Sequence, residues 1–580
     1  MNIQLILNKN SNHTSDGHLF CTRYADYEKI ASCGYLELPS LENTQRDDFI
    51  LYQNRLVDSL REENNKSEVF MSSPLGCQNT WQSDFFVGLE SFFRLKNAIK
   101  AKKNMKLVFY DCFWYLVTLN FLKSMDGIEI LYSWRALMDC HLRKIKLVIS
   151  QTYRFYDTFR YMFNISMPLS RRLKSITNTH KIIFLSVWSG SVIQSFLKNN
   201  CDPYFKDIPY FLKKTHMDPV VFCHVDNFNK KHMAELSKIK SIKVLSYFNF
   251  LSLMDLFLIL KQLLFYKLKT PKPYQWLELV MKADLRKKIW IQSCQALMVK
   301  YALDKFLRKN KGAKIVHIYE GNCWEKGCVM AARKANQSST VIGYQHTGLS
   351  VAYPKLRDAH YLMPDMILTT GEVAKKILVN NFKHQEEKVR SMCALRQDII
   401  YTHSPKNILP GAIKRVLILL QGSPFDRMLM EHVGHIRKEY TCDITVRQHP
   451  AYKIPNIENI PWITMSKEST LYQELLACDI VIHSGTTAAL EAVYLGVPCV
   501  FVDVGVAAVS DPLFQIKNNL LVQRLKENEN FSVLIENMLA EKENFDKNIL
   551  EIRQYFDKYF EEPSEEKFFL FINLLLESHT

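Results

Sequence analysis

The sequence predicts an α/β protein with two Rossmann-type, doubly wound lobes in tandem and an interdomain cleft. Short apolar runs alternate with helical patterns over most of the 580 residues, which is typical of α/β architecture. A segment near residues 396–414, with two prolines, a glycine and few periodic apolar residues, interrupts this alternation. A second alternating series follows it, so the segment is predicted to link two lobes.

The first series contains eight predicted strands with helical patterns between several of them. The helix expected at residues 324–336, for example, separates two of these strands. The strands are expected at residues 106–110, 128–132, 181–187, 219–224, 241–245, 315–319, 341–345 and 366–369.

The second series is compact and has the order of a nucleotide-binding unit. Its strands are expected at residues 416–420, 443–447, 480–483 and 499–502, and its helices at 424–439, 471–477 and 486–495. Charged amphipathic helices fill the end of the chain from about residue 530. We therefore predict an N-terminal lobe at 1–395, a linker at 396–414 and a C-terminal lobe at 415–580. Whether 1–180 form a separate module stays open.

Composition restricts the class of protein. The formal net charge of +16 favours anionic partners such as nucleotides, nucleic acid or an anionic membrane face. The fourteen cysteines form no CxxC pair and no ladder with histidines, which indicates reduced thiols in a cytoplasmic protein rather than disulfides or zinc. The N-terminus lacks the features of a signal peptide, and no apolar run is long enough for a transmembrane helix. Residues 248–268 come nearest; they predict a buried or surface helix, or a basic-flanked amphipathic helix at an anionic inner membrane.

One stretch of the second series, "IVIHSGTTAALEAVYLGVPCVF" at 480–501, combines a buried strand, a small polar turn and a helix. The turn contains Ser484, Gly485, Thr486 and Thr487 at the carboxyl end of the expected strand. A helix N-terminus exposes unpaired N–H groups, a glycine admits close approach and hydroxyls add donors, so the turn suits a phosphate. The alternative is that Ser484 or Thr486 only caps the helix.

Two further loops follow strands of the same lobe. In open α/β sheets the ligand lies outside the carboxyl ends of the strands, so these loops are expected to converge with the Ser-Gly-Thr-Thr turn. Together they offer hydrogen-bond donors and positive charge suited to a nucleotide phosphate. The loops carry Gln421, Gly422 and Ser423 in one case, and Arg447, Gln448, His449 and Pro450 in the other.

The first lobe contributes a candidate base. Glu320 follows an apolar strand and precedes Gly321, so its carboxylate is expected at a strand end that faces the cleft. Partial shielding from water would raise its pKa and suit it to general-base chemistry. The alternative is a helix cap or a pair with a lysine. Gln345 and His346 end the next strand in the same way.

Six motifs in order carry a family resemblance: "YEGNCWEKGCVMAARKA", "GYQHTG", "PDMILTTGE", "CALR", "RQHPAY" and "HSGTTAALEAVYLGVPCVFVD". They resemble bacterial surface-carbohydrate glycosyltransferases of the GT-B fold, in particular enzymes that transfer sialic-acid-like or Kdo sugars from a CMP donor into lipopolysaccharide or capsule. The resemblance covers roughly residues 315–511. Bacterial sialyltransferases share an acidic-acidic-Gly motif, to which Tyr319, Glu320 and Gly321 correspond here; Tyr319 departs from that pattern.

The resemblance implies an inverting displacement at the anomeric carbon. Glu320 then deprotonates the acceptor hydroxyl, while His449, helped by Arg447, stabilises the leaving phosphate. It also implies roles in binding for the other candidates. The same phosphate is held by Ser484, Gly485, Thr486 and Thr487, and the nucleotide pocket is lined by Gln421, Gly422 and Ser423. Glu491 either reaches a ribose hydroxyl or is an ordinary helix-face charge. Gln345 and His346 either contact the sugar or acceptor or are structural.

The chain contains no Asp-x-Asp, the pair with which many sugar transferases hold a metal ion, so we expect a metal-independent enzyme without a cofactor. The expected partners are a nucleotide-sugar donor and a glycan or lipid-linked acceptor, with peripheral contact to the inner membrane and no nucleic acid. Two alternatives stay open. One is a UDP- or NDP-sugar transferase or epimerase on the same fold. The other is a non-catalytic protein that binds polyanions or membranes.

Overall fold

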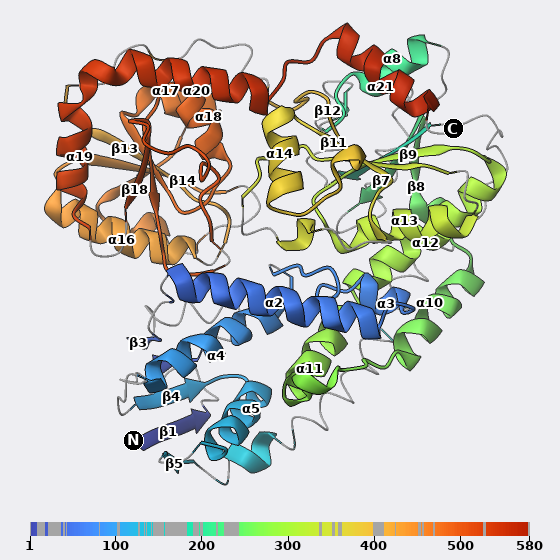
Figure 1. Cartoon of the computed structure of the whole chain (residues 1–580), viewed down its shortest axis with the longest axis horizontal. Coiled ribbons are helices and arrows are strands. Elements are labelled where there is room, and N and C mark those ends of the chain that lie inside the picture. The colour runs from blue at the N-terminus through green and yellow to red at the C-terminus, as the bar shows by residue number, and fades with distance from the viewer. Residues whose placement is uncertain are drawn as a thin grey trace.

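The computed structural model places three parallel β-sheets in one chain (Figure 1). Apart from single residues, the structure describes residues 2–7, 18–20, 36–38, 43–80, 82–100, 105–125, 128–132, 136–140, 182–188, 201–202, 204–215, 219–225, 243–335, 339–350, 354–357, 362–397, 411–423, 425–449, 457–467, 470–507, 509–525 and 529–577. Most of the predicted linker at 396–414 lies outside these residues.

The first lobe is built on a seven-stranded sheet with the order β12-β11-β10-β9-β6-β7-β8, in which all pairs are parallel. The chain starts in the middle of the sheet at β6, moves outward through β7 and β8, then returns to add β9 beside β6. The strands are β6 (Ile182–Trp188), β7 (Pro219–Val225), β8 (Lys243–Ser246), β9 (Lys314–Ile318), β10 (Val341–Tyr344), β11 (Met366–Thr369) and β12 (Val389–Ser391). The helices are α8 (Ile208–Lys214), α10 (Leu253–Phe265), α11 (Glu278–Lys288), α12 (Gln292–Lys309), α13 (Cys323–Ala335) and α14 (Glu372–Asn380).

The second lobe repeats this winding in a six-stranded sheet of order β15-β14-β13-β16-β17-β18. Its strands are β13 (Arg415–Leu419), β14 (Asp443–Arg447), β15 (Ile463–Met465), β16 (Ile480–His483), β17 (Cys499–Val502) and β18 (Val522–Leu525). Its helices are α16 (Asp426–Glu439), α17 (Leu471–Ala477), α18 (Ala488–Tyr494), α19 (Phe531–Ala540) and α20 (Phe545–Tyr559). The predicted architecture of two doubly wound lobes is confirmed. In each lobe the strand order reverses at one point, between β6 and β9 and between β13 and β16, where ligands bind in sheets of this kind.

A third α/β unit precedes the two lobes. Its parallel sheet has the order β3-β2-β4-β1-β5. The elements are β1 (Asn2–Leu7), β2 (His18–Leu19), β3 (Leu36–Glu37), α2 (Asn43–Glu63), α3 (Glu68–Met71), α4 (Asp84–Lys100), β4 (Met105–Phe109), α5 (Cys112–Lys123) and β5 (Glu129–Leu131). The sequence predicted only β4 and β5 of this sheet, because β2 and β3 are two residues long and carry no readable alternation.

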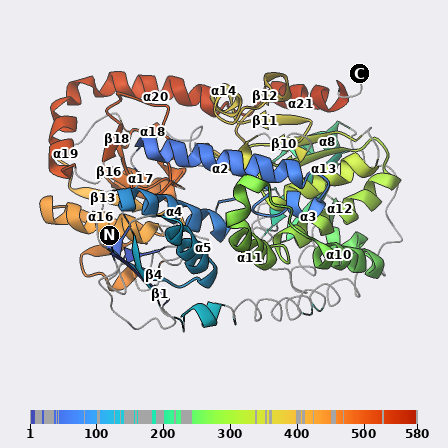
Figure 2. The same cartoon turned by 60° about the horizontal axis from the view of Figure 1, so that its bottom comes forward.

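The N-terminal unit contacts both lobes, and Figures 1 and 2 show α2 running past both of them. Near the start of α2, Arg46 pairs with Asp503 of the second lobe at 3.1 Å. Just beyond its end, Asn64 Nδ2 donates to the carbonyl oxygen of Lys269 in the first lobe at 2.7 Å. The unit therefore links the two lobes along one side.

The last helix, α21 (Glu565–Glu577), returns to the first lobe. Phe571 lies 6.4 Å from the ring of Phe184 in β6, and Phe568 lies 5.4 Å from Phe211 in α8. Although α21 follows the second lobe in the chain, its apolar face thus packs on the first. The chain crosses between lobes at Glu561, whose N–H donates to the Thr370 carbonyl.

The described cysteines, from Cys77 to Cys499, form no disulfide with one another. Residues 248–268, the most apolar segment, contain a 3-10 turn at Tyr247–Phe250 and then α10. No helix within the described ranges is both long and apolar enough to cross a membrane.

Candidate active site

Glu320 lies at the point where the strand order of the first lobe reverses. Strand β9 ends at Ile318 beside β6, and the chain then turns through Glu320 into α13. Tyr319, the departure from the family motif, points into the apolar core, where its hydroxyl contacts Met363 Sδ at 3.7 Å. The carboxylate of Glu320 is therefore the acidic group that this motif places at the end of β9.

Three polar side chains surround the Glu320 carboxylate. His346 Nε2, at the end of β10, lies 3.3 Å from Glu320 Oε1. Asn322 Nδ2 donates to Glu320 Oε2 at 2.9 Å, and Lys355 Nζ donates to Asn322 Oδ1 at 3.3 Å. One hydrogen bond, from Asn322 to Oε2, therefore orients the carboxylate, His346 lies close to Oε1 without a hydrogen bond, and the group is about one-third exposed.

The prediction that Glu320 has a raised pKa is wrong. Burial does act to raise it, but His346, Lys355, the hydrogen bond from Asn322 and Arg396 together outweigh burial and hold the pKa below its ordinary value. Glu320 is therefore a carboxylate at neutral pH. The local sequence around Glu320 indicates only shielding from water, because Lys355 and Arg396 lie far along the chain and His346 belongs to the neighbouring strand.

His346 is neutral at neutral pH. Burial, with a smaller contribution from Arg396, outweighs the attraction of Glu320 and lowers its pKa to about 3. Tyr204 meets the imidazole edge-on at 5.0 Å, and Gln397 Nε2 donates to the His346 carbonyl at 3.2 Å. A neutral imidazole can relay or donate a proton at Nε2 without cancelling the charge of Glu320.

Gln345 precedes His346 and is also buried. Its amide Nε2 donates to the carbonyl oxygen of Thr347, while its Oε1 and both ring nitrogens of His346 make no hydrogen bond with described residues. Buried polar atoms normally have partners, so these atoms mark a place where a polar ligand would be satisfied.

In the second lobe the predicted loops converge as expected. Gly422 has a φ of +83°, and a Cβ there would lie 2.6 Å from the ring of His449, so only glycine permits this close approach. A Cβ on Gly485 would lie 3.1 Å from Gln421 Oε1. Gln421 Nε2 in turn donates to Ser423 Oγ at 2.8 Å. The three loops after β13, β14 and β16 thus form one surface; Pro450 lies outside the described residues.

The backbone N–H groups of the first of these loops are already occupied. The Asp426 carboxylate accepts hydrogen bonds from the N–H groups of Gln421, Gly422 and Ser423 at 2.9–3.0 Å. Burial raises the pKa of Asp426 to about 6 although these bonds lower it. A ligand at this loop would therefore meet the side chains of Gln421 and Ser423 rather than its amides.

In the first lobe, too, a buried carboxylate accepts hydrogen bonds from the backbone N–H groups of the loop that follows a strand. Glu325 accepts from the N–H groups of Glu320 and Gly321 at 2.9–3.3 Å, and burial, with the charge of Glu320, raises the pKa of Glu325 to about 8. Glu325 and Asp426 are not among the residues predicted for the site. Each is an acidic residue in the first turn of the helix that follows a strand, where a side chain can cap the free backbone N–H groups of the turn.

In the Ser-Gly-Thr-Thr turn one hydroxyl caps the helix that follows and another lacks a hydrogen-bond partner. The N–H of Ala488 approaches Thr486 Oγ1 at 3.4 Å, whereas Thr487 makes no side-chain cap. Ser484 is fully buried, and its Oγ has no hydrogen-bond partner among the residues described. The turn therefore holds one buried hydroxyl without a described partner, next to Gly485, which lies against Gln421.

Arg447 and His449 differ in their surroundings. Arg447 Nη1 pairs with the buried carboxylate of Glu474 at 2.7 Å, which anchors it on α17. His449 is half-buried, and burial lowers its pKa, so it is neutral at neutral pH. The structure brings His449 to the converging loops and ties Arg447 to Glu474.

The two lobes meet beside these loops. A Cβ on Gly348, in the loop after β10, would lie 2.2 Å from Leu490 Cδ1 and 3.2 Å from Thr487 Cγ2 of the second lobe. The hydroxyls of Ser350 and Ser510 also form a hydrogen bond across the junction. The loop that carries Gln345 and His346 therefore lies against the start of α18.

The charge of Arg396 acts on acidic groups of both lobes. Its guanidinium stacks over the ring of Tyr204 with the Cζ atom 4.7 Å from the centroid. It lowers the pKa of Glu320 in the first lobe and opposes the rise in the pKa of Glu491 in the second. Arg396 ends the "CALR" motif and Asn322 lies in the "YEGNCWEKG" motif, so the sequence contained a signal for both, whereas nothing local marked Tyr204 or Lys355.

Glu491 gives a prediction on pH. Burial raises its pKa from 4.5 to about 7. The folded protein therefore keeps a proton that the unfolded chain loses near pH 4.5, and the free energy of unfolding falls as the pH rises from 4.5 to 7. Glu491→Gln removes this penalty. We expect denaturant titrations to show the variant more stable than wild type by about 3 kcal/mol at pH 8 and nearly equal to it at pH 5. Equal differences at both pH values would contradict the shifted pKa.

These observations define a class of site, in which polar loops at the reversal points of two doubly wound lobes lie next to each other. Among the described residues, no group of three or more His, Cys, Asp or Glu is placed to hold a metal ion. Metal independence stays a prediction.

No protein-family model matches the chain, and no curated protein matches its sequence. Similar solved structures include CalG4, the calicheamicin glycosyltransferase, at 12% identity, covering 69% of this chain and 99% of that one with a TM-score of 0.40. HepE of Anabaena, in complex with UDP and glucose, has 11% identity, coverage of 69% and 100% and a TM-score of 0.39. A UDP-N-acetylglucosamine 2-epimerase has 10% identity, coverage of 67% and 99% and a TM-score of 0.37. The strand orders, rather than these likenesses, establish the two-lobe fold.

Proposed function

We propose that the protein is an inverting, metal-independent glycosyltransferase of the GT-B type. The sugar is a nonulosonic acid or a Kdo-like sugar carried by CMP, and the acceptor is a cell-surface glycan or a lipid-linked precursor at the cytoplasmic face of the inner membrane. One observation carries the proposal: an ionised carboxylate, Glu320, stands at the reversal point of one lobe, next to the lobe junction that borders the converging loops of the other.

Glu320 acts as the general base. Its carboxylate accepts the proton of the acceptor hydroxyl as the hydroxyl oxygen attacks the anomeric carbon. The hydrogen bond from Asn322 orients one carboxylate oxygen, which leaves Oε1, beside His346, to accept the proton. Its lowered pKa keeps it deprotonated across the neutral range, at the cost of weaker basicity.

The second lobe stabilises the leaving nucleotide. The His449 imidazole donates to the donor phosphate, and the Ser484 hydroxyl, which has no described partner, supplies a further donor. Thr486 and Thr487 border the same position from the start of α18. Glu491 binds the ribose hydroxyls one turn further along the helix.

Donor screening tests the nucleotide. We expect the purified protein to release CMP from a CMP-sugar in the presence of an acceptor glycan, and to be stabilised against thermal unfolding by CMP more than by UDP. Turnover of UDP-sugars without CMP release would instead establish the UDP-sugar alternative. Epimerised donor in the absence of acceptor would establish the epimerase.

His449→Ala tests the phosphate contact. We expect the variant to keep its melting temperature, since the ring is only half-buried, and to lose about 10²–10³-fold in kcat, as for removal of one charge-stabilising donor. His435→Ala, on a partly exposed position of α16, is the matched control and should transfer at the wild-type rate. A near-normal rate in His449→Ala would remove that residue from the mechanism.

A further inference from the structure

The outward face of α10 is apolar and solvent-exposed. Six large side chains project from it, and Phe257 and Phe265 are 62% and 75% exposed. The opposite face packs into the lobe through Leu256, Ile259 and Leu263, and a capping box between Ser252 and Asp255 fixes the start of the helix. We call the exposed residues the outer face of α10: Leu253, Met254, Phe257, Leu258, Leu264 and Phe265.

The position of α10 leaves this face open. Figures 1 and 2 both place α10 on the side of the first lobe that lies away from the second lobe. A partner on the outer face would therefore not block the lobe junction that carries Glu320 and Glu491.

Basic side chains surround the outer face. Lys261 lies on α10 itself, Lys267 and Lys269 follow the helix, and Arg286 projects from α11; all four are exposed. None of them forms an ion pair with another residue that the structure describes.

Most nearby acidic groups are paired with a lysine, and the exposed Glu63, which lines a groove with Leu258 and Phe265, is the exception. Asp255 turns inward to Lys305, Glu68 pairs with Lys300, and Glu278 pairs with Lys282 at 2.6 Å. The rim of the outer face is thus positive, in keeping with the net charge of +16.

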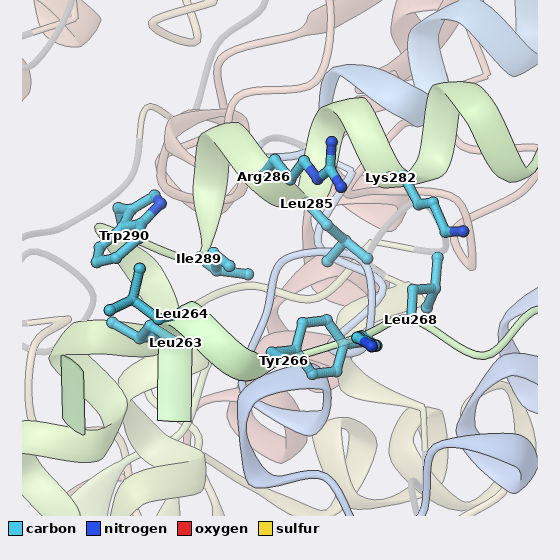
Figure 3. A pocket seen from close by; sticks show the side chains of 10 residues that line it. Leu263, Leu264, Tyr266, Leu268, Lys282, Leu285, Arg286, Ile289 and Trp290 are labelled. Carbon is cyan, nitrogen blue, oxygen red and sulfur yellow. The ribbon is translucent and has the colours of Figure 1, made fainter. Parts of the chain in front are cut away.

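A hollow opens beside the outer face, between α10 and α11. Its volume is about 390 Å³, and Figure 3 shows Leu263 and Leu264 of α10 opposite Leu285 and Arg286 of α11. Apolar side chains form its walls and cations stand at its edge. The full lining is Leu263, Leu264, Tyr266, Lys267, Leu268, Lys282, Leu285, Arg286, Ile289 and Trp290.

One polar atom in this hollow lacks a partner. The hydroxyl of Tyr266 is buried and makes no hydrogen bond within the described part of the chain, and burial raises its pKa, so it stays protonated and available as a donor. A hydroxyl donor and two or three cations above an apolar floor match an anionic group attached to a hydrocarbon chain.

We propose that the outer face of α10 docks on an anionic phospholipid bilayer, and that the hollow between α10 and α11 receives the headgroup of one anionic lipid. Phe257 and Phe265 enter the interfacial region with the helix axis parallel to the membrane. Lys261, Lys267 and Arg286 face the lipid phosphates. The charge pattern selects this occupant, since a second copy would bring an equally basic rim against the first.

Vesicle flotation tests the proposal with the full chain. We expect binding to vesicles of phosphatidylglycerol and phosphatidylcholine at low salt, at least tenfold weaker binding to phosphatidylcholine alone, and release by high salt. Phe257→Glu with Phe265→Glu should lower binding at least tenfold. Lys267→Glu with Arg286→Glu should abolish the preference for the anionic vesicles. All four side chains are exposed, so the melting temperature should stay unchanged.

The matched control is Val533→Glu with Leu550→Glu, two exposed apolar positions on α19 and α20, and it should float like wild type. Absence of wild-type flotation at low salt, or equal loss in the control, overturns the proposal. A dimer in solution that only the Phe257/Phe265 variant dissociates would assign the face to a second copy instead. Because docking is measured without turnover, its failure is independent of the proposed transferase activity.

Discussion

Glu320→Gln is expected to lower the rate of sugar transfer by about 10²–10⁴-fold while the protein stays folded. The substitution keeps the shape of the side chain and its hydrogen bond with Asn322, and removes only the negative charge and the ability to accept a proton. The measurement is kcat with a CMP-sugar and acceptor, together with the melting temperature. KM should change far less than kcat, because the base acts in the transition state.

The control for this experiment is Glu387→Gln, which changes an exposed glutamate of the same lobe. It should transfer at the wild-type rate. If Glu320→Gln retained near-normal kcat, Glu320 would be no more than the cap of α13. This result would favour the alternative of a non-catalytic protein that binds polyanions or membranes. If it lost its fold instead, the pair with His346 would be structural.

Arg94→Met is expected to destabilise the protein by about 3–5 kcal/mol, the usual cost of leaving one member of a buried ion pair without its partner. Arg94 of α4 pairs with Glu90 at 2.8 Å, and the two side chains are 2% and 5% exposed. Arg94 Nη2 also donates to the Gly505 carbonyl at 2.6 Å, and Glu90 accepts from the Ala507 N–H at 3.2 Å. The pair therefore joins the N-terminal unit to the second lobe.

Two comparisons separate this effect from a general loss of charge. Arg308→Met removes another arginine that pairs with an aspartate one turn away, Asp304. Arg308 is 61% exposed, and the buried Asp304 keeps Lys334 as a partner at 3.4 Å, so the unfolding free energy should change much less. Glu90→Gln together with Arg94→Met should recover part of the loss, because no charge then stays buried alone. Denaturant unfolding with a two-state fit on each variant gives the numbers. A loss for Arg94→Met no larger than that for Arg308→Met would contradict the coupling.

Local sequence patterns located the strand ends at which the candidate residues lie. A strand end followed by a small polar turn identified Glu320, Gln421 and Ser484, because the strand period and the turn residues are read within about ten positions. The order of the strands, and with it the two reversal points, is known only from the structure.

The lowered pKa of Glu320 could not be predicted from local patterns. It depends on Lys355 and Arg396, which lie far along the chain, and on a histidine from the neighbouring strand. The partner of Arg447 was equally hidden, since Glu474 belongs to a helix two elements later. Such pairings arise only when the sheet brings distant strand ends together.

The sequence by itself determined the doubly wound lobes and the polar loops at their strand ends, since both follow from short-range periodicity and turn chemistry. Only the tertiary structure decided the charge state of Glu320, the anchoring of Arg447 and the N-terminal unit that contacts both lobes. The physical reason is that burial and charge–charge interactions depend on distance in space, and residues such as Arg94 and Gly505 become neighbours only in the folded chain.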